Sequence, residues 1–158
     1  MMEIERKFVV PAIPFGLSGY EKAEIRQGYI AHEPTIRIRQ WNDSYILTVK
    51  GRSLRYGHDL RAREEFELAL DRAEFDALLH KVETRMIVKT RYMIPLPDGL
   101  TAEFDIYHDF LQGLLTVEVE FDNMAAAESF IAPSWFGREV TQDKRFTNSQ
   151  MSLHGIPA

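Results

Sequence analysis

Glu3-Ile4-Glu5-Arg6-Lys7, close to the start of the chain, carries a full charge at every second position. Because residues two apart in a β-strand point to the same face, Glu3, Glu5 and Lys7 share one face of a strand predicted over residues 3–10. Ile4 and Phe8 lie on the opposite face. The same period of two recurs along the chain and predicts a protein built mainly from β-strands.

Eight segments have this alternation, and turn-forming residues such as Pro97-Asp98-Gly99 separate several of them. The predicted strands cover residues 3–10, 25–31, 35–41, 44–50, 61–70, 86–95, 101–107 and 114–121. Three further segments have helical features, each preceded by an N-cap candidate. They are a helix that Asp71 caps and that runs through about Val82, residues 124–131 capped by Asp122 or Asn123, and a short stretch capped by Thr147. Strands that follow one another with few helices between them predict an antiparallel α+β protein.

The charged faces of these strands carry pairs of like charge. The acidic pairs are Glu3 with Glu5, Glu65 with Glu67, Glu103 with Asp105, and Glu118 with Glu120. The basic pairs are Arg37 with Arg39 and Lys89 with Arg91, and Lys7 and Lys50 are single basic residues. An ordinary half-buried sheet also alternates, so one strand alone indicates only a solvated face. Like-charge pairs on most strands instead favour ligands of opposite charge, an anion at the basic pairs and a cation at the acidic ones.

Eight antiparallel strands can close into a barrel. If the charged faces point inward, the lumen is a wet binding site and the apolar faces lie outside, under helices and loops. A polyphosphate with a divalent metal fits such a lumen. Arg37 and Arg39 can grip phosphate oxygens with paired hydrogen bonds, and carboxylates are the ligands that Mg²⁺ and Mn²⁺ prefer. We therefore expect a closed eight-stranded antiparallel β-barrel, a tunnel with a charged lumen flanked by a few helices.

Composition narrows the class of protein further. The 158 residues fit a single domain, 1–158, and the net charge of -5 argues against a broad nucleic-acid surface. The absence of cysteine excludes disulfides and thiolate metal sites. No apolar run approaches the ~20 residues of a membrane span, and the charged start lacks the pattern of a signal peptide. We expect a cytoplasmic protein without a membrane or nucleic-acid partner, and a homodimer stays open.

The order of the charged motifs resembles that of the CYTH superfamily, the triphosphate tunnel metalloenzymes. Glu3-Ile4-Glu5-Arg6-Lys7 matches the signature Glu-x-Glu-x-Lys of that family. The motifs that follow in the same order are Arg26-Gln27-Gly28-Tyr29, Thr35-Ile36-Arg37-Ile38-Arg39, Leu47-Thr48-Val49-Lys50, Arg63-Glu64-Glu65-Phe66-Glu67, Lys89-Thr90-Arg91, Glu103-Phe104-Asp105, Glu118-Val119-Glu120 and Asp143-Lys144-Arg145-Phe146. The resemblance covers nearly the whole chain and is greatest to the short, single-domain bacterial members.

The resemblance implies a hydrolase that splits inorganic triphosphate (tripolyphosphate) into pyrophosphate and phosphate inside the tunnel. The implied substrate-binding residues are Lys7, Arg37, Arg39, Lys50, Lys89, Arg91 and Lys144. The implied ligands of Mg²⁺ or Mn²⁺, with two ions per site, are Glu3, Glu5, Glu65, Glu67, Glu103, Asp105, Glu118 and Glu120. One ion would orient the triphosphate, and a second would activate water.

The general base is harder to assign from the sequence. Lys7 is expected to lie among other cations, which would lower its pKa and free its amine as a base. Tyr29 has the strand parity to reach the lumen and pair with Lys7, although an aromatic residue packed at one barrel end has the same parity.

Several alternative functions stay open. Within the same fold, the enzyme could act on an organic triphosphate, as a class IV-type adenylate cyclase, a nucleoside triphosphatase or a thiamine triphosphatase. The lack of an obvious adenine pocket favours the inorganic substrate. A non-catalytic polyphosphate-binding module would gain nothing from so many carboxylates, and a β-sandwich interaction module would show no metal-dependent activity.

Overall fold

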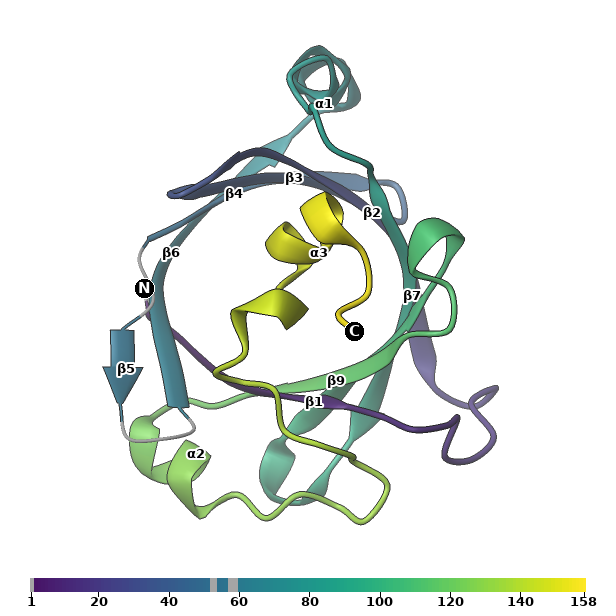
Figure 1. Cartoon of the computed structure of the whole chain (residues 1–158), viewed down its shortest axis with the longest axis vertical. Helices are drawn as coiled ribbons and strands as arrows, with labels where there is room; N and C mark the ends of the chain where they lie inside the picture. The colour runs from purple at the N-terminus through teal and green to yellow at the C-terminus, as the bar shows by residue number, and fades with distance from the viewer. Residues whose placement is uncertain (1, 52–53, 57–59) are drawn as a thin grey trace.

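The computed structural model describes residues 2–51, 54–56 and 60–158, with side chains described for residues 2–51 and 62–158. Its centre is a closed ring of antiparallel strands, seen end-on in Figure 1. The strands of the ring are, in spatial order, β1 (Met2–Val9), β9 (Leu115–Glu120), β8 (Thr101–Tyr107), β7 (Ile87–Pro95), β2 (Glu21–His32), β3 (Thr35–Trp41), β4 (Ser44–Lys50) and β6 (Leu60–Leu70). Pairing of β1 with β6 closes the ring. The predicted closed eight-stranded barrel is confirmed.

Two strands differ from the sequence prediction by more than one residue at an end. A short strand, β5 (Leu54–Tyr56), pairs with β6 and lies outside the ring. Strand β2 begins at Glu21, four residues before its predicted start, because Glu21–Glu24 pair with β7. Pairing with β7, which lies far along the chain, sets this start, so the local sequence did not predict it.

Three helices follow the predicted N-caps. Helix α1 (Arg72–Leu79) starts at Asp71, whose carboxylate accepts from the Glu74 backbone in a reciprocal capping box. Helix α2 (Met124–Ser129) is capped by Asn123, and α3 (Asn148–His154) is capped by Thr147. Helices α1 and α2 lie outside the barrel, whereas α3 lies within the ring of strands in Figure 1. No helix in the described residues is long and apolar enough to cross a membrane.

The main hydrophobic core lies outside the barrel wall. Phe104 on β8 is fully buried and packs edge-on against Trp135, with ring centroids 5.9 Å apart. Phe8 on β1 packs against Phe136 at 5.0 Å, beneath the segment that follows α2. Gly137 allows this segment to pass close to the barrel, because a β-carbon there would overlap the carbonyl oxygen of Val9. The apolar faces of β1 and β8 are therefore covered from outside, which leaves their inner faces free to carry charge.

Candidate active site in the barrel lumen

A cavity of about 470 Å³ fills the inside of the barrel. Its wall contains the charged strand residues Glu3, Glu5, Lys7, Arg37, Arg39, Lys50, Arg63, Glu65, Glu67, Lys89, Arg91, Glu103, Glu118 and Glu120, together with Tyr29. The structure thus brings the site residues expected from the sequence into one cavity, except for Asp105 and Lys144. The strand parity accounts for this arrangement, because alternate residues of each strand face the lumen.

The basic part of the cavity includes Arg37, Arg39 and Arg91. Burial and the neighbouring guanidinium groups of Arg37 and Arg91 lower the pKa of Arg39 to about 9, which still leaves Arg39 cationic at neutral pH. Arg37 donates from Nη2 to Thr48 Oγ1 at 3.2 Å, while its buried Nε has no hydrogen-bond acceptor among the described residues. Mutually repelling cations and a buried donor without a partner are expected where an anion binds.

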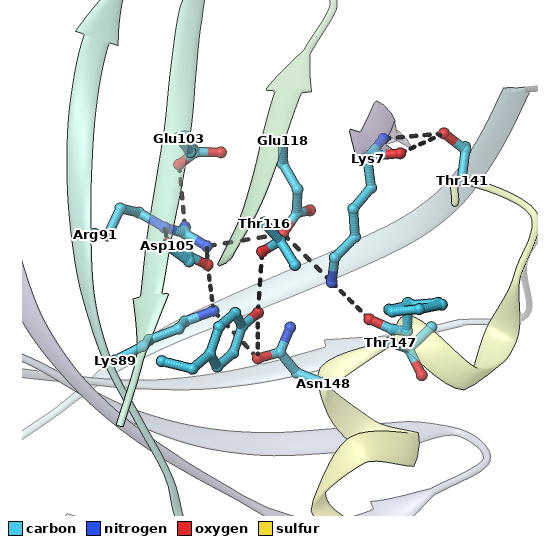
Figure 2. Close-up of polar contacts among 12 residues, drawn as sticks. Lys7, Lys89, Arg91, Glu103, Asp105, Thr116, Glu118, Thr141, Thr147 and Asn148 are labelled. Carbon is cyan, nitrogen blue, oxygen red and sulfur yellow. Dashed lines mark hydrogen bonds and ion pairs between the residues drawn. The ribbon is translucent and has the colours of Figure 1, made fainter. Parts of the chain in front are cut away.

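Asp105 anchors the basic residues from behind, as Figure 2 shows. Its Oδ1 accepts from Arg91 Nε at 2.7 Å, and its Oδ2 accepts from Arg91 Nη2 at 2.9 Å and from Lys89 Nζ at 2.8 Å. Burial would raise the pKa of Asp105, but Arg91 and Lys89 outweigh it and lower the pKa to about 2. Asp105 is fully buried and is not part of the cavity wall. Both carboxylate oxygens are therefore committed to holding two basic side chains.

The acidic part of the cavity is centred on Glu3, Glu5 and Glu120. One carboxylate oxygen from each of the three lies within 4.8 Å of the others. Glu5 is half-buried, and burial, with the charges of Glu118 and Glu3, raises its pKa well above the usual range. Glu120 reaches water at the rim, and partial burial with the nearby Glu103 and Glu3 charges raises its pKa to about 7. Three carboxylates that repel one another at this spacing fit a hard divalent cation.

Lys50 connects the acidic part of the cavity to β6. Its Nζ lies 2.8 Å from Glu3 Oε1 and 3.8 Å from Glu65 Oε2. Burial alone would raise the pKa of Glu3, but the Lys50 ammonium, together with a hydrogen bond to Glu65, outweighs burial and the pKa is lowered. Glu65 behaves oppositely, because burial and its contact with Glu3 raise its pKa to about 8. Glu67, two residues farther on, is exposed at the edge of the cavity.

Lys7 differs from the sequence expectation in its electrostatic surroundings. Burial favours its neutral form, but Tyr107 and the carboxylates of Glu118 and Glu5 outweigh burial and raise its pKa. The expectation that neighbouring cations lower the pKa of Lys7 is therefore wrong. Lys89 shows that effect instead: burial, with Arg91 and Arg39, outweighs Asp105 and lowers its pKa to about 7. The sequence could not distinguish these two lysines because Tyr107 and Glu118, near Lys7, and Arg39, near Lys89, come from other strands.

The two tyrosines in this region have different partners. Tyr29, the residue that the sequence paired with Lys7, accepts a hydrogen bond from Gln27 Nε2 at 2.8 Å and stacks on His32. Tyr107, and not Tyr29, contributes to the raised pKa of Lys7. Its hydroxyl donates to Asn148 Oδ1 at 3.4 Å. Burial, opposed in part by Lys7, raises the pKa of Tyr107 to about 12.

The C-terminal segment contributes contacts that strand alternation could not predict. Lys7 Nζ donates to the carbonyl oxygen of Phe146 at 2.7 Å, and Lys89 Nζ donates to Asn148 Oδ1 at 3.2 Å. Ser149 Oγ lies 2.6 Å from His32 Nδ1, which ties α3 to β2. Lys144 is exposed outside this cavity, so its expected contact with substrate stays a prediction. The sequence signals for this segment were the Asp143-Lys144-Arg145-Phe146 motif and the N-cap Thr147, and neither predicts the contacts of Phe146, Asn148 and Ser149.

Comparisons with known proteins are consistent with these observations. The model of the CYTH domain family matches residues 1–147. An inorganic triphosphatase from Nitrosomonas europaea is 40% identical over 157 residues, which cover 97% of this chain and 98% of that protein. An inorganic triphosphatase from Acetivibrio thermocellus is 35% identical over 151 residues, 94% of this chain and 92% of its own length. The crystal structure of an inorganic triphosphatase superposes with a TM-score of 0.68 at 38% identity, covering 99% of this chain and 97% of that one.

Proposed function

The chain belongs to the CYTH domain family, whose model matches residues 1–147, and on that premise we propose that it hydrolyses inorganic triphosphate to pyrophosphate and phosphate. The observation that carries the proposal is the meeting of basic and acidic groups in one cavity. Arg39 and Arg91 lie on the same cavity wall as Glu5 and Glu120. An anion alone would leave the carboxylates unused, whereas triphosphate with a divalent metal matches both sets. The two inorganic triphosphatases described above support the choice of substrate.

The basic residues hold the substrate and neutralise its charge. Arg37 and Arg39 offer planar guanidinium groups to phosphate oxygens, while Lys7 and Lys50 act as point charges. Phosphoryl transfer needs little covalent chemistry from a protein, since positioning and charge stabilisation supply most of the rate enhancement. Asp105 contributes indirectly, because it fixes the side chains of Arg91 and Lys89 at 2.7–2.9 Å.

The donor set fits a hard divalent cation, and we propose Mg²⁺ or Mn²⁺. Glu3, Glu5 and Glu120 would hold one ion, because their oxygens already lie within 4.8 Å of one another. Glu65, Glu67, Glu103 and Glu118 line the same cavity and are the carboxylates available to a second ion. Asp105 is excluded from this set, because Arg91 and Lys89 occupy both of its oxygens. When bound, such ions supply Lewis-acid charge neutralisation and acidify water.

Lys7, Lys89 and Tyr29 have different roles in this proposal. Because its pKa is raised, Lys7 stays an ammonium group at neutral pH and is suited to stabilise charge on a phosphate oxygen. Lys89 has a pKa of about 7 and can exist in both protonation states in the working range. Tyr29 lines the cavity, and its hydroxyl group could donate to the substrate.

The proposal is tested by phosphate release from tripolyphosphate, ATP and thiamine triphosphate, each with Mg²⁺, with Mn²⁺ and with EDTA. We expect metal-dependent release that is fastest from tripolyphosphate. Glu5→Gln should abolish it, whereas Glu128→Gln, which changes an exposed acid on α2 outside the cavity, should leave it unchanged. Faster turnover of ATP with cyclic AMP as product, or tripolyphosphate binding without hydrolysis, would refute the assignment.

A further inference from the structure

We propose that Gln27 is a positioning residue, whose side-chain amide aligns Arg39 and directs the hydroxyl proton of Tyr29 into the substrate cavity. This inference rests on the proposed function, because it concerns how the same cavity receives triphosphate. Gln27 is uncharged and fully buried, and it lies behind the cavity wall between two residues that face the cavity.

Gln27 joins two neighbouring strands. It lies directly opposite Arg39 in the pairing of β2 with β3, and Tyr29 follows two residues later on the same face of β2. Arg39 Nε donates to Gln27 Oε1 at 2.9 Å, and Gln27 Nε2 donates to Tyr29 Oη at 2.8 Å. One amide group therefore contacts both a substrate-binding cation and a cavity-lining phenol.

The orientation of the amide follows from the chemistry of its partners. A guanidinium group only donates hydrogen bonds, so the carbonyl oxygen of Gln27 must face Arg39. The amide nitrogen then faces Tyr29, and the phenol oxygen must accept. The hydroxyl proton of Tyr29 is thereby turned away from Gln27, and within residues 2–51 and 62–158 no protein acceptor binds it. A phosphate oxygen in the cavity could accept this proton.

The hydrogen bond between Gln27 and Arg39 orients the guanidinium group of Arg39 for substrate binding. Its Nε is bound to Gln27, while its two terminal nitrogens make no hydrogen bond to the described residues. Those nitrogens form the fork that binds two phosphate oxygens at once. A fixed Nε holds this fork in one orientation and lowers the conformational entropy lost when the substrate binds.

Glutamate at position 27 would have nearly the same shape but would reverse one hydrogen bond. A carboxylate only accepts, so Tyr29 would donate its proton to position 27 rather than to substrate. The new negative charge would also offset the charge of Arg39. Since a hydrogen bond to a charged group contributes ~1.5–3 kcal/mol, Gln27→Glu should lower kcat roughly tenfold to a hundredfold and raise KM.

A double-mutant cycle separates positioning from a structural role. Gln27→Glu, Tyr29→Phe and the double variant are compared for kcat and KM with tripolyphosphate, and thermal unfolding is measured for each. Gln27→Met serves as a second variant, because it removes both hydrogen bonds without adding a buried charge. Gln40→Glu is the matched control, since Gln40 lies on β3 and bonds Arg26 and the Asn42 backbone, away from the cavity.

We expect the kcat loss caused by Gln27→Glu to vanish in the Tyr29→Phe background, while the rise in KM remains. An equal kcat loss in both backgrounds, or wild-type kcat in folded Gln27→Glu and Gln27→Met, would overturn the proposal. The ¹³Cζ chemical shift of Tyr29 supplies a readout without turnover, and Gln27→Glu should move it while Gln40→Glu does not. An unmoved shift overturns the inference about Gln27 alone, whereas a wild-type protein inactive on tripolyphosphate overturns the proposed function.

Discussion

Glu5 on β1 and Glu120 on β9 lie directly opposite each other, with both carboxylates facing one cavity. Like charges at opposed positions of paired strands are destabilising. The pKa values reflect this cost: burial with the neighbouring acids raises that of Glu5, and that of Glu120 rises to about 7. The barrel therefore keeps an arrangement that is unfavourable without a cation, which links its stability to pH and to metal.

Without metal, the protein should lose stability as the pH rises from 5 to 7. A carboxyl group whose pKa is raised by folding stabilises the fold below its unfolded pKa, and this contribution is lost as the pH passes its folded pKa. Glu120, at about 7, and Glu65, at about 8, both act in this direction. Thermal unfolding in EDTA should show Tm falling across this window. Mg²⁺ should restore Tm at pH 7, and Glu120→Gln should reduce the fall in Tm without removing it, because Glu65 remains. A flat wild-type profile contradicts the account.

Asp105→Asn should destabilise the protein by ~3–5 kcal/mol, because it leaves Lys89 and Arg91 buried without their counter-charge. Asp143→Asn is the matched control, since Asp143 pairs with Arg145 at the surface and such pairs contribute less than ~1 kcal/mol. Chemical denaturation measures both variants. Equal, small losses would show that the Asp105 ion pairs contribute little.

Phe104→Ala should cost ~3–5 kcal/mol of stability, because Phe104 fills the core between the outer wall of the barrel and Trp135. Phe66, which is 60% exposed on β6, is the comparison, and its replacement by alanine should change stability by less than ~0.5 kcal/mol. Denaturant titrations of both variants test whether the hydrophobic core lies outside the barrel. A larger loss for Phe66→Ala would argue against that location.

Arg39→Ala should raise KM for tripolyphosphate roughly tenfold to a hundredfold, since it removes charged hydrogen bonds to phosphate. Arg26→Ala, on the exposed outer side of β2, removes the same charge from the protein without touching the cavity. Steady-state kinetics at constant ionic strength compare the two. A similar rise in both would mean that overall charge, rather than contact in the lumen, governs binding.

The strand alternation was sufficient to predict the barrel and most of its lumenal charges. Arg37 and Arg39, or Glu118 and Glu120, fall on one face whatever the partner strands are, because the period of two is local. Contacts between distant segments were not predictable in this way. Lys89 contacts Asn148, 59 positions later in the chain, and Lys7 contacts the carbonyl of Phe146, 139 positions later, because the C-terminal segment docks against the barrel.

Gln27 was overlooked for a different reason. It lies on the same face of β2 as Tyr29, but an uncharged side chain does not stand out in a pattern of alternating full charges. Its position opposite Arg39 depends on the register between β2 and β3, which alternation alone does not define. Alternation also could not predict that the pKa of Lys7 is raised, because Glu118 and Tyr107, which raise it, lie on β9 and β8.

A crystal grown with Mn²⁺ and a non-hydrolysable triphosphate analogue tests the central claim most directly, through the anomalous signal of manganese. The account predicts a manganese peak within bonding distance of Glu3, Glu5 and Glu120, with the analogue in the same cavity against Arg37 and Arg39. Manganese or analogue bound only on the outer surface, with the lumen filled by water, would contradict it.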